Sequence, residues 1–283
     1  MKVLVTGFNG QLGYDVVKRF SLNGVTAVGV DINDFDLTDK KSTIEYVKKV
    51  SPDVIVHCAA YTAVDKAEED KEVAWNVNVN GTENIALAAK EVDAKFIYIS
   101  TDYVFNGEGE TPFETDDIKS PLNVYGETKL EGERVATALL KKLFIIRVSW
   151  VFGVNGKNFV KTMLSLSEKL SSLTVVSDQI GSPTYTYDLA KLICDMSLTE
   201  KYGVYHATNE GYCSWYEFAK EIFKTADIEM KVSPVLTKDY ITAAKRPLNS
   251  RLSKKKLDEE GFNRLPTWQD ALNRYIKEIK EGK

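Results

Sequence analysis

An α/β fold with a parallel, doubly wound sheet is predicted by the order of the sequence patterns. Over the first 150 residues, short apolar runs alternate five times with stretches of helical periodicity. Such alternation favours a parallel sheet covered by helices on both faces, with ligands at the carboxyl ends of its strands. This alternation ends after residue 150. We therefore expect one domain over residues 1–150, to which residues 185–225 return, and a smaller C-terminal subdomain over residues 151–184 and 226–283.

Composition limits the class of protein. Of the 283 residues, 43% are hydrophobic and 28% are charged, which is ordinary for a soluble globular protein. A net charge of −4 argues against a nucleic-acid partner. Cys58, Cys194 and Cys213 are too far apart for a zinc site or a disulfide framework. The first apolar run is too short for a signal peptide, and no stretch is long enough to span a membrane. We expect a cytoplasmic protein with no membrane partner.

A glycine-rich turn follows the first predicted strand, at residues 2–6. Gly7 and Gly10 permit a tight turn and close approach of a diphosphate, and Gly13 lets the following helix, near residues 11–22, pack on the strand. Free N–H groups and the helix dipole favour phosphate at this helix end. The pattern predicts a Rossmann-like, dinucleotide-binding domain. The cofactor is expected to contact the glycines and the residues between them, Asn9, Gln11 and Leu12.

The second predicted strand, residues 25–30, ends at Asp31. Its carboxylate can accept hydrogen bonds from a ribose diol and repel a 2′-phosphate, which favours NADH without excluding NADPH. The alternative is an ordinary turn residue at the end of a strand. Asp36 and Leu37 follow in a loop that could flank the adenine.

The third predicted strand, residues 53–57, leads into small residues. Ala59 and Ala60 leave room for the cofactor backbone, and Tyr61 and Thr62 could reach the ribose or phosphate on the nicotinamide side. His57 lies in an apolar run, so we expect it to be a core residue.

The remaining elements follow from periodicity. One helix is predicted over residues 73–92 despite Gly81; it contains asparagines at positions 76, 78 and 80, one of which could bond a backbone group or the cofactor. A long loop over residues 102–121 is typical of lids and binding loops. Further helices are expected near residues 40–50, from residue 122 onward through Lys129, and near 158–170, 187–198, 215–224 and 268–279, and strands near 95–101, 143–148, 173–176 and 203–207.

Carbonyl reduction is indicated by three residues around the long loop. Thr101 ends the strand at residues 95–101, and Tyr125 and Lys129 lie four apart on one face of the next helix. A nearby ammonium favours the phenolate and should lower the pKa of Tyr125 from about 10. Tyr125 would protonate the carbonyl oxygen while the Thr101 hydroxyl holds it.

The spacing of Tyr125 and Lys129 is not unique. It also begins at Tyr14, Tyr187 and Tyr216. Only the pair at Tyr125 follows a strand that ends in Ser-Thr and a nucleotide-type glycine turn. Ordinary solvated helix pairs are expected for Tyr14 and Tyr216.

Three further side chains suit a ligand. Trp150, just after the strand at residues 143–148, could stack on a ligand or simply pack in the core. Arg246 and Arg251 carry forked donors that suit a diphosphate, although surface ion pairs would also explain them.

The chain resembles a known family over nearly its whole length. The matching stretches, in order, are VTGFNGQLG at 5–13, CAAYTAVDKAE at 58–68, STDYVFNG at 100–107, SPLNVYGETKLEGE at 120–133, RVSWVFG at 147–153, DQIGSPT at 178–184 and RPLNSRL at 246–252. They resemble the extended short-chain dehydrogenases/reductases and, within them, the dTDP-4-dehydrorhamnose reductases. The resemblance implies that NADPH or NADH reduces the 4-keto group of a dTDP-6-deoxy-hexulose, giving dTDP-L-rhamnose for polysaccharide.

The resemblance also implies roles for individual residues. Thr101, Tyr125 and Lys129 would be catalytic, with the last two also touching the cofactor. The smaller subdomain would help to bind the dTDP-sugar, with Asp102, Tyr103 and Trp150 near the sugar and Arg246 and Asn249 near the diphosphate.

The resemblance implies less about metal binding and about the oligomeric state. Some relatives bind Mg²⁺ through acidic residues at a dimer contact. Asp15 matches one such position, but Tyr187 stands where another acidic residue is expected, so no metal ligands are predicted. Both a monomer and a homodimer fit the sequence.

The same residues also bear on three rival functions. A 4,6-dehydratase needs a second acid/base group beside Asp102, where this chain has Tyr103. A non-catalytic nucleotide-binding protein is a second alternative, because the fold is similar to that of the regulatory subunit of methionine adenosyltransferase. Another nucleotide-sugar reductase or epimerase is a third. The joint presence of Thr101, Tyr125 and Lys129 favours an enzyme.

Overall fold

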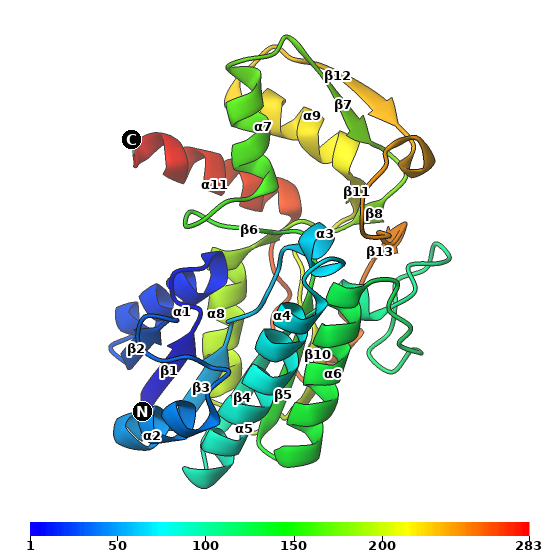
Figure 1. Cartoon of the computed structure of the whole chain (residues 1–283). Helices are drawn as coiled ribbons and strands as arrows, with labels where there is room; N and C mark the ends of the chain where they lie inside the picture. Colours follow the sequence, from blue (N-terminus) through cyan, green and yellow to red (C-terminus); the bar gives the residue numbers. More distant parts are fainter. Residues whose placement is uncertain (283) are drawn as a thin grey trace.

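The main layer of the molecule is a parallel sheet with helices on both sides. The computed structural model describes residues 1–282. The strands of the main sheet are β1 Lys2–Thr6, β2 Thr26–Val30, β3 Val54–His57, β4 Lys95–Thr101, β5 Leu143–Val148 and β10 Gly203–His206. All are parallel, in the order β10-β5-β4-β3-β1-β2, so the chain changes direction across the sheet between β1 and β3 (Figure 1). The predicted parallel, doubly wound sheet is confirmed.

Both faces of the main sheet are buried, because successive residues of a strand point to opposite sides. Val3 and Val5 of β1 lie in one apolar cluster with the first group of helices. Leu4 lies in a separate cluster with the second group. The first group is α1 Gln11–Leu22 and α8 Thr186–Ser197, and the second is α2 Lys40–Val50, α5 Gly81–Glu91 and α6 Val124–Leu139.

A smaller layer stands over the carboxyl ends of the main strands (Figure 1). It has its own apolar cluster, which includes Phe152, Phe218 and Trp268. Its elements are β6 Val151–Phe152, α7 Phe159–Ser167, β7 Ser172–Val176, β8 Ile180–Gly181, β9 Thr184–Tyr185, β11 Cys213–Ser214, α9 Trp215–Ala226, β12 Lys231–Val235, η3 Thr237–Asp239, β13 Asn249–Ser250 and α11 Trp268–Glu281. Helix α10, Lys255–Glu259, packs back on the main layer through Leu257.

One part of the predicted division differs from the structure. Residues 185–225 were expected to return to the main layer, and α8 and β10 do so. Helix α9 instead lies in the smaller layer, because its apolar face, which includes Phe218, Ile222 and Phe223, is buried among α7 and α11. Within residues 1–282, no helix combines the length and the apolar character that crossing a bilayer requires.

The helix predicted over residues 73–92 is interrupted. It consists of α4 (Lys71–Trp75), a π-helical turn η1 (Asn76–Asn80) and α5. The π turn places the Asn78 side chain in the interior, where its amide bonds both backbone groups of Tyr61 and the hydroxyl of Thr128, at 2.8 to 3.2 Å. A single regular helix was therefore the wrong expectation, because a buried amide with polar partners compensates for the irregular turn.

The long loop after β4 is anchored to the rest of the molecule. It begins with the 3₁₀ turn η2, Asp102–Val104. The backbone N–H of Phe113 then donates to the carbonyl of Arg251 at 2.9 Å, and the Asn249 amide donates to the carbonyl of Thr111 at 2.8 Å. The loop is thus fixed against residues 249–252 of the smaller layer.

A buried ion pair joins α6, β4, β5 and this loop. Arg147 and Glu133 are 1% and 5% exposed, and two charge-assisted hydrogen bonds of 2.8 and 2.7 Å link them. Ser100 donates to the same carboxylate at 2.5 Å. Arg147 also donates to the carbonyl of Thr115 in the loop at 2.9 Å. Every element that carries a predicted catalytic residue is therefore tied to this pair.

Replacing Glu133 with glutamine should strongly destabilise the fold. The change leaves the charge of Arg147 buried without a counter-charge, which costs about 3 to 5 kcal/mol. Urea unfolding measures this loss. The matched control is Glu131→Gln on the same helix, whose partner Arg134 is exposed; it should cost less than about 1 kcal/mol. Equal losses for the two variants would contradict the importance given to the buried pair.

Candidate active site

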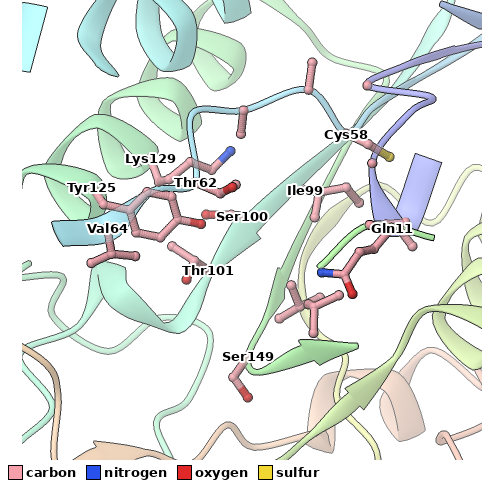
Figure 2. A pocket seen from close by; sticks show the side chains of 18 of the residues that line it. Gln11, Cys58, Thr62, Val64, Ile99, Ser100, Thr101, Tyr125, Lys129 and Ser149 are labelled. Carbon is pink, nitrogen blue, oxygen red and sulfur yellow. The ribbon is translucent and has the colours of Figure 1, made fainter. Parts of the chain in front are cut away.

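A cavity of about 850 Å³ lies between the carboxyl ends of the main strands and the smaller layer. Most of the predicted site residues meet there, although they come from distant parts of the sequence. Figure 2 shows Tyr125, Lys129 and Thr101 gathered on one side of the cavity, with Gln11 and Cys58 on the other. The predicted residues that line it are Gly7, Gly10, Gln11, Leu12, Gly13, Asp31, Ala59, Ala60, Thr62, Thr101, Asp102, Tyr103, Tyr125, Lys129 and Trp150.

The glycine turn forms a cradle that side chains would fill. Gly7 has a φ of +69°, and a Cβ there would lie 2.7 Å from the backbone nitrogen of Ala59. A Cβ on Gly13 would lie 2.3 Å from the carbonyl oxygen of Gly7. Helix α1 begins next to this turn with Gly10 as its N-cap, which supplies no side-chain cap. The first N–H groups of α1 therefore face the cavity and suit a dinucleotide diphosphate.

Asp31 lies beside the glycine turn. Its carboxylate accepts hydrogen bonds from the backbone N–H groups of Asn9, at 3.0 Å, and Ile32, at 2.9 Å. Asn9 thus reaches the site through its backbone and does not line the cavity. Asp36 and Leu37 line a smaller adjoining cavity of about 80 Å³ that shares Asp31 with the main one. The prediction that these two residues flank the adenine would put the adenine near this smaller, mostly apolar space.

Helix α6 begins where it does because its first N–H groups find caps. The Asn123 side chain accepts from the N–H of Gly126 at 2.8 Å, and the Glu68 carboxylate accepts from that of Val124 at 2.9 Å. Tyr125 therefore lies in the first turn and Lys129 one turn further along the same face. At the end of β4, the Thr101 hydroxyl donates to the Asp102 carboxylate at 3.0 Å. The helix start and the strand end together bring the three residues to one wall of the cavity.

Burial controls the protonation of the two titratable groups. It raises the pKa of Tyr125 above its ordinary value, and hydrogen bonding to Thr101 opposes this only in part. Burial also lowers the pKa of Lys129 to about 7, against the opposing charge of Glu133. The predicted lowering of the pKa of Tyr125 by Lys129 is therefore wrong, because desolvation of the phenol dominates. Tyr125 keeps its proton at neutral pH.

Lys129 is stabilised by an aromatic face. It is 3% exposed, and its Nζ lies 4.1 Å from the centre of the Tyr98 ring. Asp102 beside Thr101 is equally buried, and desolvation raises its pKa to about 6. His57 is a core residue, as expected: it bonds Thr6 at 2.7 Å, and burial lowers its pKa to about 3.

Besides Asn9, three predicted residues line neither of the two cavities. The Tyr61 hydroxyl donates to Asp70 at 3.0 Å. Asn249 bonds the long loop, as described above. Arg246 is engaged by Asp65 through both terminal nitrogens, at 3.0 and 2.5 Å. For Arg246, the ion pair that the sequence left open as an alternative is present.

Some residues that line the cavity were not predicted from the sequence. Trp215 lines it, and its indole stacks on that of Trp150 with ring centres 3.7 Å apart. Gly156, Lys157 and Asn158 line it from the smaller layer, and the Asn158 amide donates to Gln11 at 3.1 Å. The glycine and asparagines within residues 155–158 are typical of a turn, and this was the only sequence pattern that could have drawn attention to the segment. Trp215 gave none, because its helix carries an ordinary amphipathic pattern.

Asp15 and Tyr187, the two positions compared with the metal ligands of relatives, make other contacts in this structure. Asp15 is buried and accepts a hydrogen bond from the Thr186 hydroxyl. The Tyr187 ring packs under the guanidinium of Arg19, 4.6 Å from the ring centre. In the part of the chain that the structure describes, no group of three or more His, Cys, Asp or Glu side chains could hold a metal ion.

The class of protein follows from the glycine turn on one side of the cavity and the three residues on the opposite wall. A dinucleotide fold with Thr101, Tyr125 and Lys129 at its strand ends defines a nicotinamide-dependent oxidoreductase of the short-chain dehydrogenase/reductase type. The chain belongs to the family described as RmlD substrate binding domain, whose model matches residues 1–281.

Known relatives cover nearly the whole chain. The spore coat polysaccharide biosynthesis protein SpsK of Bacillus subtilis is 40% identical, over 98% of this chain and 97% of its own. The dTDP-4-dehydrorhamnose reductase of Aggregatibacter actinomycetemcomitans is 41% identical, over 96% and 97%. The structure of the dTDP-4-dehydrorhamnose reductase of Bacillus anthracis in complex with NADP is also 41% identical, covers 98% of this chain and 100% of its own, and superposes with a TM-score of 0.96.

The lowered pKa of Lys129 predicts how stability depends on pH. The folded pKa is about 7 and the unfolded one about 10.4, so between these values only the unfolded chain holds the proton. Stability should therefore rise with pH, by up to about 3 kcal/mol from pH 7 to 9.5. The Lys129→Met variant should lack this increment, and Lys41→Met, at an exposed position, should keep it. Urea unfolding at several pH values measures the slopes, and identical slopes for wild type and Lys129→Met would exclude a neutralised Lys129.

Proposed function

We propose that this protein reduces dTDP-4-dehydro-6-deoxy-L-mannose (dTDP-4-dehydrorhamnose) to dTDP-L-rhamnose with NADPH or NADH, for polysaccharide biosynthesis. The observation that carries the proposal is the position of Thr101, Tyr125 and Lys129 on one wall of a cavity whose opposite side is a dinucleotide cradle. Relatives named for this reaction match over their full length at about 40% identity. One of them was solved with NADP.

In the proposed reaction, Tyr125 is the proton donor. The bound nicotinamide supplies hydride to the ketone carbon C4. Tyr125 then gives its proton to the oxygen of C4; a phenol whose pKa is raised remains protonated at neutral pH but is still more acidic than the alkoxide that forms. The Thr101 hydroxyl helps to hold that oxygen.

Lys129 acts on the phenolate that is left behind. Its ammonium lies one helical turn from Tyr125, and a cation there stabilises negative charge on the phenolic oxygen. Because its pKa is about 7, the charged form is available near neutral pH, and formation of a phenolate nearby favours it further. The pair thus couples proton donation to charge stabilisation.

We propose the remaining roles by position. The residues of the glycine turn, with Asp31, Asp36, Leu37 and the segment from Ala59 to Thr62, would bind the dinucleotide. Asp102, Tyr103 and Trp150 would contact the sugar, since they line the cavity on the side of the smaller layer and η2. This assigns dinucleotide binding to residues 1–150, and the same residues supply the proposed sugar contacts at the edge that faces the smaller layer.

The proposed cellular location is based on the state of the cysteines and on the proposed substrate. Cys58, Cys194 and Cys213 are free thiols, which suits a reducing compartment. Nucleotide sugars and nicotinamide cofactors are cytoplasmic metabolites, so we propose a cytoplasmic enzyme. All proposed catalytic and cofactor residues come from one chain, so a single copy would hold a complete site, whether the protein is a monomer or a homodimer.

Removing the Tyr125 hydroxyl should abolish most of the turnover. Tyr125→Phe is expected to lower kcat by roughly 10² to 10⁴, because general-acid catalysis is lost while the ring and the fold remain. The assay follows oxidation of NADPH or NADH by purified protein with the keto-sugar nucleotide. Tyr216→Phe is the control, since Tyr216 heads the same Tyr-x-x-x-Lys spacing on α9. Near-normal turnover in Tyr125→Phe would refute the assignment, and no turnover in the wild type would favour a non-catalytic protein.

Asp31 should govern the choice between the two cofactors. Asp31→Asn keeps the shape of the side chain but removes the charge that would repel a 2′-phosphate. We expect the ratio of kcat/KM for NADPH over NADH to rise about tenfold. Asp34→Asn, on the same turn, should leave the ratio unchanged. If Asp31→Asn also leaves it unchanged, the carboxylate serves only to bond the turn at Asn9.

A further inference from the structure

Two tryptophans from different elements line the cavity side by side. Trp150 lies between β5 and β6, and Trp215 is the first residue of α9. Their indoles are nearly parallel, with an interplanar angle of 15° and ring centres 3.7 Å apart. The residue proposed to contact the sugar therefore packs face to face on a second indole.

The backbone of Trp150 is strained. Its φ is +49°, in the left-handed region that bulky residues rarely adopt. Within residues 1–282, the other non-glycine residues with a positive φ are Ser51, Asp93 and Asp227. These three follow the helices α2, α5 and α9, where a left-handed residue commonly ends a helix. No helix end explains Trp150, so the packing of its side chain has to compensate for the strain.

A small sheet of the smaller layer contributes to that packing. In the sheet β11-β8-β13, Gly181 of β8 pairs with Cys213 of β11. A Cβ on Gly181 would lie 2.8 Å from Cε2 of Trp150, so a side chain there would displace the indole. Trp150 therefore lies against the backbone of the sheet whose strand β11 leads directly into Trp215.

Trp215 is held by the start of its own helix. Ser214 is the N-cap of α9, and its hydroxyl accepts from the N–H of Glu217 at 3.1 Å. The Glu217 carboxylate accepts in turn from the N–H of Ser214 at 2.7 Å, which completes a capping box. Phe159 packs on Trp215 with ring centres 4.6 Å apart. The position of Trp215 is thus set by α9 and by the core of the smaller layer.

We propose that Trp215 is a positioning residue for substrate binding: its indole holds Trp150 in the strained conformation in which Trp150 meets the sugar. The inference rests on the proposed function, since the ligand is a 6-deoxy-sugar nucleotide. Such a sugar carries a methyl group in place of a hydroxymethyl group, and an aromatic ring suits its apolar face. Because the indole of Trp150 is ordered before the ligand arrives, its ordering costs no free energy at the moment of binding.

The stacked indoles should give a spectroscopic signature. Among residues 1–282, Trp150 and Trp215 are the one pair of tryptophans in ring contact. Exciton coupling between two stacked indoles produces a paired positive and negative band in far-ultraviolet circular dichroism. We expect this couplet in the wild type and its loss in Trp215→Leu. A wild-type protein without the couplet would overturn the proposal, because the indoles would not be stacked in solution.

Loss of the stack should weaken binding of the sugar and leave binding of the nucleotide intact. For Trp215→Leu we expect the KM for the keto-sugar nucleotide and the Kd for dTDP-L-rhamnose to rise about tenfold. The values of kcat and of the Kd for dTDP alone and for NADPH should stay within about twofold. Trp215→Phe keeps an aromatic face and should restore the KM to within about threefold of the wild type. Steady-state kinetics and calorimetry measure these quantities.

The matched control is Trp268→Leu. Trp268 belongs to the same apolar cluster and packs on Phe218, as Trp215 does, but it does not line the cavity. This variant should lower the midpoint of urea unfolding and leave the KM and the couplet unchanged. A merely structural role of Trp215 predicts the same behaviour for Trp215→Leu, so an unchanged KM in that variant would overturn the proposal.

A double-mutant cycle tests whether Trp215 acts through Trp150. In a Trp150→Leu background, Trp215→Leu should add almost nothing to the loss of affinity for dTDP-L-rhamnose. Full additivity would overturn the proposal, as would equal weakening of dTDP and dTDP-L-rhamnose in Trp215→Leu.

Binding of dTDP-L-rhamnose keeps this proposal distinct from the reaction. A wild-type protein that binds dTDP-L-rhamnose without reducing the keto sugar would refute the proposed function and would still show the effect of Trp215. A wild-type protein that reduces the keto sugar, with an affinity for dTDP-L-rhamnose that does not depend on Trp215, would overturn the positioning role and leave the proposed function standing.

Discussion

The buried pair of Arg147 and Glu133 is the constraint on which the active-site wall depends. A charge pair in the interior costs desolvation energy, and it persists only with close geometry and further hydrogen bonds. Here each charge has them: Glu133 accepts from Ser100, and Arg147 donates to the carbonyl of Thr115. The pair therefore fixes the spacing of β4, β5, α6 and the long loop, and with it the spacing of Thr101, Tyr125 and Lys129.

Burial also gives the site its chemistry. In water a phenol and an ammonium would be a weak acid and a permanent charge with little influence on each other. In this cavity desolvation raises the pKa of Tyr125 and lowers that of Lys129 to about 7. In the proposed reaction, the phenol keeps the proton that a ketone reduction consumes, and the amine can carry a charge when negative charge forms beside it.

The site also depends on the main and the smaller layer enclosing one cavity between them. The cradle at Gly7 and Gly13 belongs to the main layer, whereas Trp215 and residues 156–158 come from the smaller one. The contact of Asn158 with Gln11 joins the layers beside the cavity, and the ion pair of Arg246 with Asp65 joins them elsewhere. A substrate that spans both layers is therefore recognised by groups whose positions are set before it binds, which lowers the entropic cost of binding.

The sequence by itself determined the sheet, most element bounds, the glycine cradle and the meeting of Thr101, Tyr125 and Lys129 on one wall, because these depend on local periodicity and on the rule that parallel strands end at one edge. Only the tertiary structure decided the rest. The π turn at Asn78, the partner of Arg246, the place of α9 and of Trp215, and the direction of the pKa shift of Tyr125 all depend on which groups meet across long sequence distances. Burial and pairing of that kind are properties of the packed molecule, and no local pattern of residues encodes them.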